Sequence, residues 1–393
     1  MFNKYAVPQL LAWLSLWVLL LHPVSFGQSQ SPSMAELMIQ GGHFDNISAI
    51  EFSTDGKFVL TGSKDRSAVL WDFETKRQLR RFSNHSSSVS AVSFSRDGNR
   101  ILTASNRDVY LWETETGKLI RQYRIPSQSF WVETVVFSAS GYFIAVASGC
   151  GRSIYMWDTR KGTSDPLWIN HNYSGNVSFS PDDEYVVVGG GYCNDGKLAV
   201  LYSSNGGLFQ ELENSQAIKG LNGHKRFDVV SYTSDGQVIF ANDNDGNVYL
   251  WSSTSGTELH RLHHEEQIRT LAITEDKTKL LAVGVENVFS WQLSVTGEKQ
   301  LSSRLLGRKG LKEPQSDSSY PVTVAAISPD FHYVLTATDE YRDDARKDYR
   351  VHLWDLREVF HLGYFEGLIS EAFAANFLQI GRASCRERVC MLV

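Results

Sequence analysis

The side chains that could do chemistry in this sequence are few and scattered. A run of metal-binding residue types, His263-His264-Glu265-Glu266, offers imidazole and carboxylate ligands of the kind that zinc takes. Adjacent residues on one loop rarely converge on one ion, so we interpret the run as a surface turn. The sequence has no G-x-S-x-G nucleophile motif, no phosphate-binding loop and no paired Cys-x-x-Cys. We therefore expect no catalytic residue, no metal and no cofactor.

Cysteine is the other reactive residue type to consider. Cys150 and Cys193 could form a disulfide in an oxidising compartment. Two cysteines define no spacing pattern, so free thiols are the favoured interpretation and a disulfide is the open alternative. The run Ala383-Ser384-Cys385-Arg386 faintly echoes the cysteine motif of caspase-like peptidases, but it has no matching histidine context and we discard it.

The elements that would position any site come from a repeated pattern, and its best-preserved copy is 43–72. Three apolar runs, 47–52, 58–60 and 68–71, are separated by short turns. The pair Asp55-Gly56 in the first turn is a strong hairpin signal, because Gly tolerates a positive φ and Asp can hydrogen-bond within its own turn. The stretch predicts a three-stranded antiparallel meander.

The pattern recurs along most of the chain. Aligning the residue that ends each third strand gives Trp71, Trp112, Trp157, Tyr202, Trp251, Trp291 and Trp354, which are 41, 45, 45, 49, 40 and 63 residues apart. A period in the forties with four strands per unit is typical of a propeller blade. The first three strands are near-continuous apolar runs, as expected for strands buried on both faces, and the fourth strand is more polar. Seven third strands predict seven blades.

These residues carry a family resemblance. A Trp-Asp pair occurs as Trp71-Asp72, Trp157-Asp158 and Trp354-Asp355, and a Gly-His pair opens two repeats as Gly42-His43 and Gly223-His224. Over 36–365 the chain resembles the WD-repeat β-propellers. The resemblance implies an all-β fold: a seven-bladed β-propeller of four-stranded antiparallel blades, with the last blade closed by an N-terminal strand at 36–40.

Two alternatives concern how the ring closes. Residues 359–365 could supply the fourth strand of the last blade in place of 36–40. The segment that begins at Gly367 resembles the start of an eighth repeat. An eight-bladed ring that lacks most of one blade is therefore the second interpretation.

The resemblance also implies a buried hydrogen-bond relay of His, Ser or Thr, Asp and Trp. In the first repeat the second position would be Thr61 or Ser63. An Asp six residues before the Trp recurs in only two other repeats, so the relay is at best partial in most blades. We interpret these residues as structural, because buried charges seldom lack partners. The full set is His43, Thr61, Asp65, Trp71, His224, Asp245, Trp251, Asp348 and Trp354.

Insertions gather on one predicted face. The segments that join blades and the turns between second and third strands share this face, because successive strands alternate in direction. Long loops on a rigid scaffold are where binding residues usually lie, with solvated surface loops as the open alternative. The candidate partner-binding residues are Tyr192, Asp195, Arg308, Lys309, Asp339, Glu340, Tyr341, Arg342, Asp343 and Asp344.

Both ends of the chain differ from the repeats. Residues 1–27 predict a signal peptide, since one Lys precedes an apolar stretch shorter than the roughly 20 residues that span a bilayer; an uncleaved anchor is the open alternative. Residues 28–35 would be a linker, 36–366 the propeller and 367–378 the start of a truncated further segment. The run 379–389 matches the translation of a common sequencing adapter, so we expect 379–393 to be an artefactual tail.

The net charge and the repeat architecture together limit the possible functions and partners of this chain. A formal net charge of −6 argues against nucleic-acid and anionic-lipid partners. We expect a non-catalytic, exported (periplasmic or secreted) monomer that binds protein partners through the face carrying the blade-connecting loops, with no membrane contact beyond the export signal. The alternative is the N-terminal recruitment or regulatory propeller of a larger protein, whose catalytic domain, for example a caspase-like peptidase, is missing from this chain.

Overall fold

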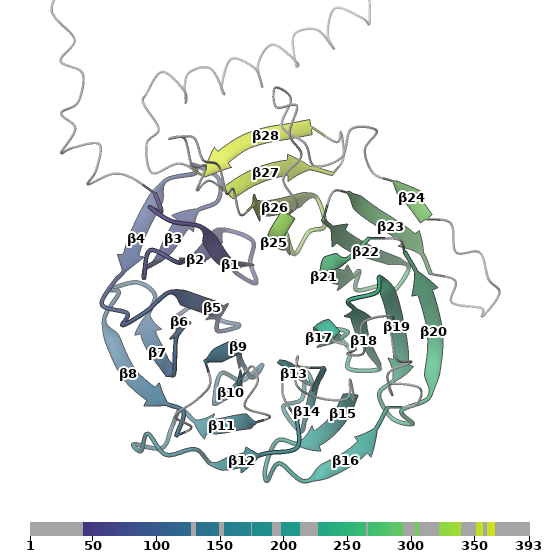
Figure 1. The fold of residues 1–393 in the computed structure, drawn as a ribbon, viewed down its shortest axis with the longest axis horizontal. Coiled ribbons are helices and arrows are strands. Elements are labelled where there is room, and N and C mark those ends of the chain that lie inside the picture. Colours follow the sequence, from purple (N-terminus) through teal and green to yellow (C-terminus); the bar gives the residue numbers. More distant parts are fainter. Residues whose placement is uncertain are drawn as a thin grey trace, which may run out of the picture. The chain divides into compact units, whose positions relative to one another are not determined.

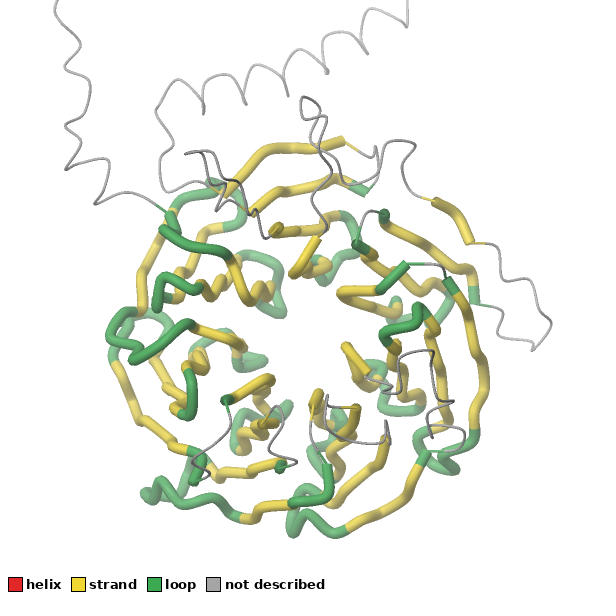
Figure 2. The backbone as a smooth tube through the Cα atoms, viewed as in Figure 1, coloured by secondary structure: helices red, strands yellow, loops and turns green. Residues whose placement is uncertain are grey.

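The computed structural model places seven four-stranded sheets around a common axis (Figure 1). Strands and short turns alternate throughout the described part (Figure 2). The predicted all-β, seven-bladed propeller of antiparallel four-stranded blades is confirmed. No helix within the described residues has the length and apolar character needed to cross a membrane. The structure describes residues 42–126, 131–148, 153–173, 175–190, 198–212, 227–264, 266–285, 287–293, 303–305, 322–338, 351–356 and 360–365.

Each blade is a meander whose first strand lies nearest the axis (Figure 1). Blades one to three comprise β1 (Ile47–Phe52), β2 (Phe58–Ser63), β3 (Ala68–Asp72), β4 (Gln78–Phe82), β5 (Val89–Phe94), β6 (Arg100–Ser105), β7 (Asp108–Glu113), β8 (Leu119–Arg124), β9 (Val132–Phe137), β10 (Phe143–Ser148), β11 (Ile154–Asp158) and β12 (Trp168–Asn170). Blades four to seven comprise β13 (Gly175–Phe179), β14 (Tyr185–Gly190), β15 (Leu198–Tyr202), β16 (Leu208–Glu211), β17 (Phe227–Tyr232), β18 (Val238–Asp243), β19 (Asn247–Ser252), β20 (Glu258–His263), β21 (Ile268–Ile273), β22 (Lys279–Gly284), β23 (Val288–Gln292), β24 (Ser303–Leu305), β25 (Val322–Ile327), β26 (Tyr333–Thr338), β27 (Val351–Asp355) and β28 (Phe360–Phe365).

The last blade takes its fourth strand from its own end of the chain. β28 pairs with β27 in the fourth position of this sheet. This strand lies within 359–365, the segment that the sequence offered as the alternative. The segment 36–40, which we expected to close this blade, lies outside the described residues.

Apolar clusters fill all seven seams between neighbouring blades. At the first seam, Leu60 and Leu70 of blade one pack against Ile101 of blade two. Equivalent clusters fill the next five seams. The ring closes in the same way, because Phe52 of blade one packs with Leu353 of blade seven. Burial on both faces is why the inner strands have near-continuous apolar sequences.

Polar residues join the inner ends of the blades. In six blades the second residue of the innermost strand lies in a β-bulge and is polar: Ser48, Ser90, Glu133, Asp228, Arg269 and Thr323. Ser90 Oγ donates a hydrogen bond to the carbonyl oxygen of Val132 in the next blade at 2.7 Å. Arg269 Nε donates to the carbonyl oxygen of Val322 at 2.9 Å. A bulge re-aims the side chain that it contains, so the apolar seams acquire hydrogen bonds at their inner ends.

Glu51 is an ionisable group on the innermost strand of blade one. It is partly buried against blade two, where the backbone N–H of Phe94 lies 3.4 Å from Glu51 Oε1. Burial raises the pKa of Glu51 to about 8, and the hydrogen bonds from Phe94 and Ser93 only partly oppose the rise. The carboxyl group is therefore protonated over much of the neutral pH range.

The turn between the first and second strands follows one motif, Ser/Thr-x-Asp, in most blades. Ser95 Oγ donates to Asp97 Oδ1 at 2.6 Å, and Thr233 Oγ1 donates to Asp235 Oδ1 at the same distance. The Asp carboxylate in turn accepts a hydrogen bond from a backbone N–H two residues later. Blade three is the exception in sequence, because Ser140 stands where the other six blades have Asp.

The outermost strands end each sheet with an irregular edge. In blade one, Leu79 falls at a bulge between Gln78 and Arg80 and is exposed, whereas Phe82 is buried. Ile120, Phe209 and Leu259 occupy the same place in blades two, four and five and are exposed as well. A bulge twists an edge strand away from regular pairing, which discourages a second molecule from extending the sheet.

Candidate functional site

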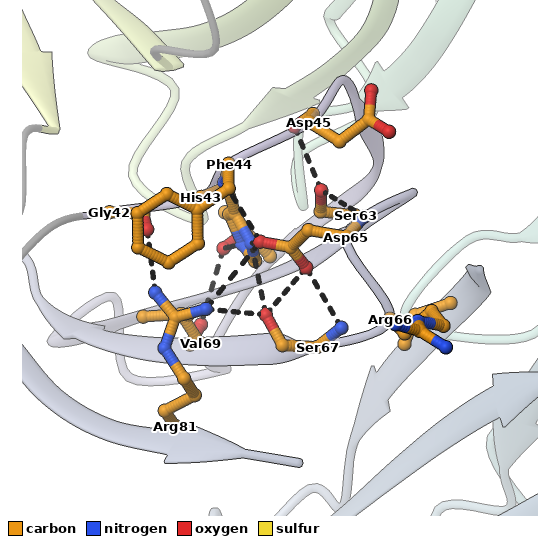
Figure 3. A network of polar contacts seen from close by, with 12 residues as sticks. Gly42, His43, Phe44, Asp45, Ser63, Asp65, Arg66, Ser67, Val69 and Arg81 are labelled. Carbon is orange, nitrogen blue, oxygen red and sulfur yellow. Dashed lines mark hydrogen bonds and ion pairs between the residues drawn. The ribbon is translucent and has the colours of Figure 1, made fainter. Parts of the chain in front are cut away.

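The innermost strands all begin at one face of the ring, which we call the loop face. It carries the connections between blades and the turns between second and third strands. On this face of blade one, Trp71 Nε1 donates to Thr61 Oγ1 at 2.9 Å, and Thr61 Oγ1 lies 2.7 Å from His43 Nε2. His43 Nδ1 lies 2.9 Å from Asp65 Oδ2 (Figure 3). The structure thus brings four of the predicted relay residues into one hydrogen-bonded chain.

One assignment of protons satisfies every member of this chain. The Thr61 hydroxyl donates to His43 Nε2, and the N–H of His43 Nδ1 donates to the Asp65 carboxylate. Burial lowers the pKa of His43, against the opposing influence of Asp65, so the imidazole is neutral at pH 7. His43 is buried with both ring nitrogens occupied, and it therefore has no position from which to act as a general acid or base.

Asp65 is the charged residue at the end of this hydrogen-bond relay. Its carboxylate accepts hydrogen bonds from the backbone N–H of Phe44 at 2.9 Å, from the backbone N–H of Ser67 at 2.8 Å and from the Ser67 hydroxyl at 2.6 Å (Figure 3). Burial alone would raise the pKa of Asp65, but the hydrogen bonds from His43 and Ser67 outweigh it and hold the pKa well below its ordinary value. Arg81 adds a guanidinium 3.5 Å from the carboxylate.

Blade two keeps the hydrogen-bond relay but without its Asp. Trp112 Nε1 donates to Thr103 Oγ1 at 2.9 Å, and Thr103 bonds to His85 Nε2 at 2.7 Å. His85 Nδ1 donates to the carbonyl oxygen of Arg66 in blade one at 3.1 Å. A backbone carbonyl from the neighbouring blade therefore takes the part that Asp65 plays in blade one. His85 thus has the same role in blade two as His43 has in blade one, with a different acceptor.

Blade seven keeps the Thr–Trp bond, since Trp354 Nε1 donates to Thr336 Oγ1 at 2.9 Å. This bond therefore occurs in blades seven, one and two, which are consecutive in the ring. The strand register places an apolar residue at the position of Thr61 in the other four blades: Val146, Val188, Ala241 and Ala282.

The expectation for Asp245 is wrong. Asp245 is exposed, and its backbone N–H donates to Asp243 Oδ1 at 3.0 Å. Asp243 is the buried acid of this blade, and it accepts hydrogen bonds from Asn247 Nδ2 at 2.8 Å and from Tyr249 Oη at 2.9 Å. The six-residue spacing misled because Ala241 replaces the Thr of the relay, which removes the hydroxyl that links Trp to His. Trp251 is buried and stacks on Tyr249, with ring centroids 5.4 Å apart.

The alignment at blade four also needs correction. Val59 pairs with Trp71 in blade one, and the equivalent residue of blade four, Val186, pairs with Leu201. Tyr202, which we aligned with the tryptophans, lies one position later and packs on Tyr185 and Phe209 near the rim. Leu201 is six residues after Asp195 in the sequence, which is the spacing between Asp65 and Trp71 in blade one.

The remaining predicted residues lie outside the described part of the chain. This applies to His224 and Asp348 of the relay set and to both cysteines, Cys150 and Cys193. It also applies to every candidate partner-binding residue: Tyr192, Asp195, Arg308, Lys309, Asp339, Glu340, Tyr341, Arg342, Asp343 and Asp344.

Two exposed aromatic residues on the loop face escaped the sequence reasoning. Phe44 precedes β1 and Trp131 directly precedes β9, and each side chain is 50% exposed. The guanidinium of Arg81 lies 5.3 Å from the centre of the Phe44 ring, and the Phe44 backbone is bonded to Asp65 (Figure 3). Their place in the sequence was no signal, because Tyr173 also precedes an innermost strand, β13, and is buried in a seam.

Comparison with known proteins agrees with this architecture. The family model described as WD domain, G-beta repeat, matches residues 35–72, 76–113 and 117–158. Protein tipD of Dictyostelium discoideum is 23% identical over 265 residues, which are 64% of this chain and 41% of that protein. Eukaryotic translation initiation factor 3 subunit I of Emericella nidulans is 24% identical over 242 residues, 59% of this chain and 66% of that protein. The same subunit of Homo sapiens is 23% identical over 336 residues, 85% of each. The chain thus spans less than two thirds of the first two relatives.

The comparison contradicts the predicted export of the chain. Two of the three similar proteins named above are subunits of a translation initiation factor, and eukaryotic translation initiation takes place inside the cell. An apolar stretch near the N-terminus led to the prediction of a periplasmic or secreted protein. Residues 1–27 lie outside the described part, and the location that we derived from them is withdrawn.

Proposed function

We propose that this chain is a non-catalytic WD-repeat scaffold that binds protein partners through its loop face. The observation that carries the proposal is the pair of half-exposed aromatic side chains, Phe44 and Trp131, held on this face by well-bonded backbone. Large aromatic residues contribute much of the binding energy in protein interfaces when a partner buries them. Singly exposed apolar residues are common on any surface, so the proposal needs both aromatics on one face together with a rigid frame beneath them.

The frame under Phe44 supports this assignment. The relay of blade one fixes His43 and Asp65, and Asp65 in turn bonds to the backbone N–H of Phe44. Trp131 is adjacent to Val132, whose backbone N–H donates to the carbonyl oxygen of Asn106 at 2.7 Å. Both aromatics therefore sit beside backbone that is already ordered, and a partner would lose little conformational entropy from this side on binding. The relatives named as subunits of a translation initiation factor are themselves parts of an assembly, which agrees with a scaffold.

Affinity purification with quantitative mass spectrometry tests the proposal. The tagged full chain is compared with the double variant Phe44→Ala/Trp131→Ala. The matched control is Tyr142→Ala, because Tyr142 is 47% exposed in a turn on the opposite face. We expect the double variant to lose partners that the Tyr142 variant retains, with the melting temperature unchanged in both. Equal partner sets for all three proteins would overturn the loop face as the binding surface.

A further inference from the structure

Basic side chains lie on the loop face between the two exposed aromatics. They come from the turns between second and third strands and from the ends of the outermost strands in blades one and two. We call the following residues the basic strip: Phe44, Lys64, Arg66, Arg81, Arg107, Arg124 and Trp131. Asp45 is a partly exposed acid next to Phe44. The strip contrasts with the chain as a whole, whose formal net charge is −6.

The acids that balance this strip are buried beneath it. The Asp65 side chain is 6% exposed under Arg81, and the Asp108 side chain is 3% exposed under Arg124. Arg124 bonds to both oxygens of Asp108, at 2.8 and 3.2 Å, yet remains 63% exposed. At Arg124 an approaching molecule therefore meets the guanidinium group first, while the carboxylate that fixes it stays beneath the surface; the Arg81 side chain is less accessible, at 23% exposed. Paired and fixed guanidinium groups lose less freedom on binding than mobile lysines do.

Hydrogen bonds to backbone carbonyl oxygens hold the strip continuous across two seams. The carbonyl oxygen of Arg66 accepts a hydrogen bond from His85, which crosses the seam between blades one and two. The carbonyl oxygen of Arg107 accepts one from the backbone N–H of Ile125 at 3.0 Å. Asn106, the neighbour of Arg107, bonds to the residue that follows Trp131. The two turns and the two aromatics are thus parts of one connected frame.

We propose that the basic strip binds an acidic segment of a partner protein, whose apolar side chains cover Phe44 and Trp131. This inference rests on the proposed function and specifies the chemistry of its partner. Arginine pairs carboxylates with two parallel hydrogen bonds, and the aromatic rings at both ends supply apolar contact. The strip is short and the whole chain is acidic, so the long-range field disfavours a polyanion such as RNA and favours a short acidic peptide.

Fluorescence polarisation with labelled peptides tests the strip directly. The probe is a 12-residue peptide of alternating Glu and Leu, and its counterpart has Gln in place of every Glu. We expect the full chain to bind the acidic peptide at least tenfold more tightly than the Gln peptide, and the difference to shrink as salt is added. The double variant Arg66→Glu/Arg107→Glu is expected to lose at least tenfold in affinity. The neutral variant Arg66→Gln/Arg107→Gln, which tests the same contacts without charge reversal, is expected to lose about half of that on a logarithmic scale.

The matched control reverses two exposed charges on the opposite face, Arg96→Glu/Lys279→Glu, and should leave peptide affinity unchanged. Equal affinity for the Glu and Gln peptides, or equal loss in strip and control variants, would overturn the inference. Tighter binding of a single-stranded RNA oligonucleotide than of the acidic peptide would overturn it too. The purification experiment separates the two proposals. If partners depend on Phe44 and Trp131 but not on Arg66 and Arg107, the acidic-segment inference fails and the scaffold function stands.

Discussion

The carboxylate of Asp183 in blade four accepts a hydrogen bond from the backbone N–H of Ser140 in blade three, at 3.0 Å. It also accepts one from the backbone N–H of Ala139 at 2.6 Å. In the other blades an Asp accepts hydrogen bonds within its own turn, and in blade three the Ser140 hydroxyl takes this place by accepting from the backbone N–H of Tyr142 at 3.2 Å. The carboxylate from the neighbouring blade therefore adds bonds to two further backbone N–H groups of this turn. Asp183 does so from a left-handed backbone conformation, with φ at +63°.

Removing this carboxylate should weaken the seam between blades three and four. We expect Asp183→Ala to lower the free energy of unfolding by about 1–3 kcal/mol, because two backbone donors lose their acceptor and Ala tolerates positive φ poorly. Asp183→Asn keeps one acceptor oxygen and tolerates this φ, so its loss should be smaller. Urea denaturation of both variants measures the difference. Equal stability of wild type and Asp183→Ala would contradict the bridge.

The relay of blade one should depend on the Thr61 hydroxyl. Thr61→Val keeps the shape but leaves the buried Trp71 N–H and His43 Nε2 without their partner, which should cost about 2 kcal/mol of stability. Thr61→Ser retains the hydroxyl and should recover most of that loss. Thr254→Val, at an exposed position, is the control and should change stability by less than about 0.5 kcal/mol. A larger loss for Thr61→Ser than for Thr61→Val would mean that the methyl group, not the relay, matters at this position.

Blade five has two acids that are two residues apart, and the structure buries Asp243 but exposes Asp245. We expect Asp243→Ala to lower the free energy of unfolding by about 2–3 kcal/mol, because Tyr249 and Asn247 lose a buried, charged acceptor. Asp245→Ala should change it by less than about 0.5 kcal/mol, since the side chain is exposed. Thermal unfolding of the two variants side by side decides which acid is structural. The reverse order would restore the role that the sequence spacing assigned to Asp245.

Glu51 should make stability depend on pH. Its folded pKa of about 8 lies above the unfolded value of 4.5, so the folded state binds more protons between these values. The contribution is complete below pH 4.5 and is lost as the pH rises through 8. Relative to wild type, Glu51→Gln should therefore gain stability as the pH rises from 4.5 to 8, by at most about 5 kcal/mol. Unfolding free energies from pH 4 to pH 9, taken as a difference between the two proteins, provide the measurement; a constant difference would show that Glu51 does not titrate in this way.

The repeat made the fold predictable, because each blade restates the same pattern of apolar runs and turns. Trp71, Trp112 and the other aligned residues set the number of blades without any knowledge of contacts. The alignment failed by one position at Tyr202, because an aromatic residue there packs on the rim and only the strand register reveals Leu201 at the tryptophan position. Local pattern thus fixes which strands exist, whereas register depends on pairing that a single sequence does not display.

The site was less predictable because its parts come from different repeats. His85 donates a hydrogen bond to the carbonyl oxygen of Arg66, and the backbone N–H of Ser140 donates to the carboxylate of Asp183. Such contacts join residues 19 and 43 positions apart and leave no periodic signal. Phe44 and Trp131 were passed over because an aromatic residue has the same appearance in a sequence whether it is buried or exposed. Their importance depends on the face on which they lie.

The seam between blades one and seven differs from the other six in one respect: its two blades are not consecutive in the sequence. Phe52 and Leu353 belong to the apolar cluster that joins the first and last blades there. Force applied to the two ends of the propeller is therefore expected to separate this seam before the other six. A covalent linker across this seam would close the ring of blades. Cutting the chain at a different seam would then give a circular permutant with the same seven blades.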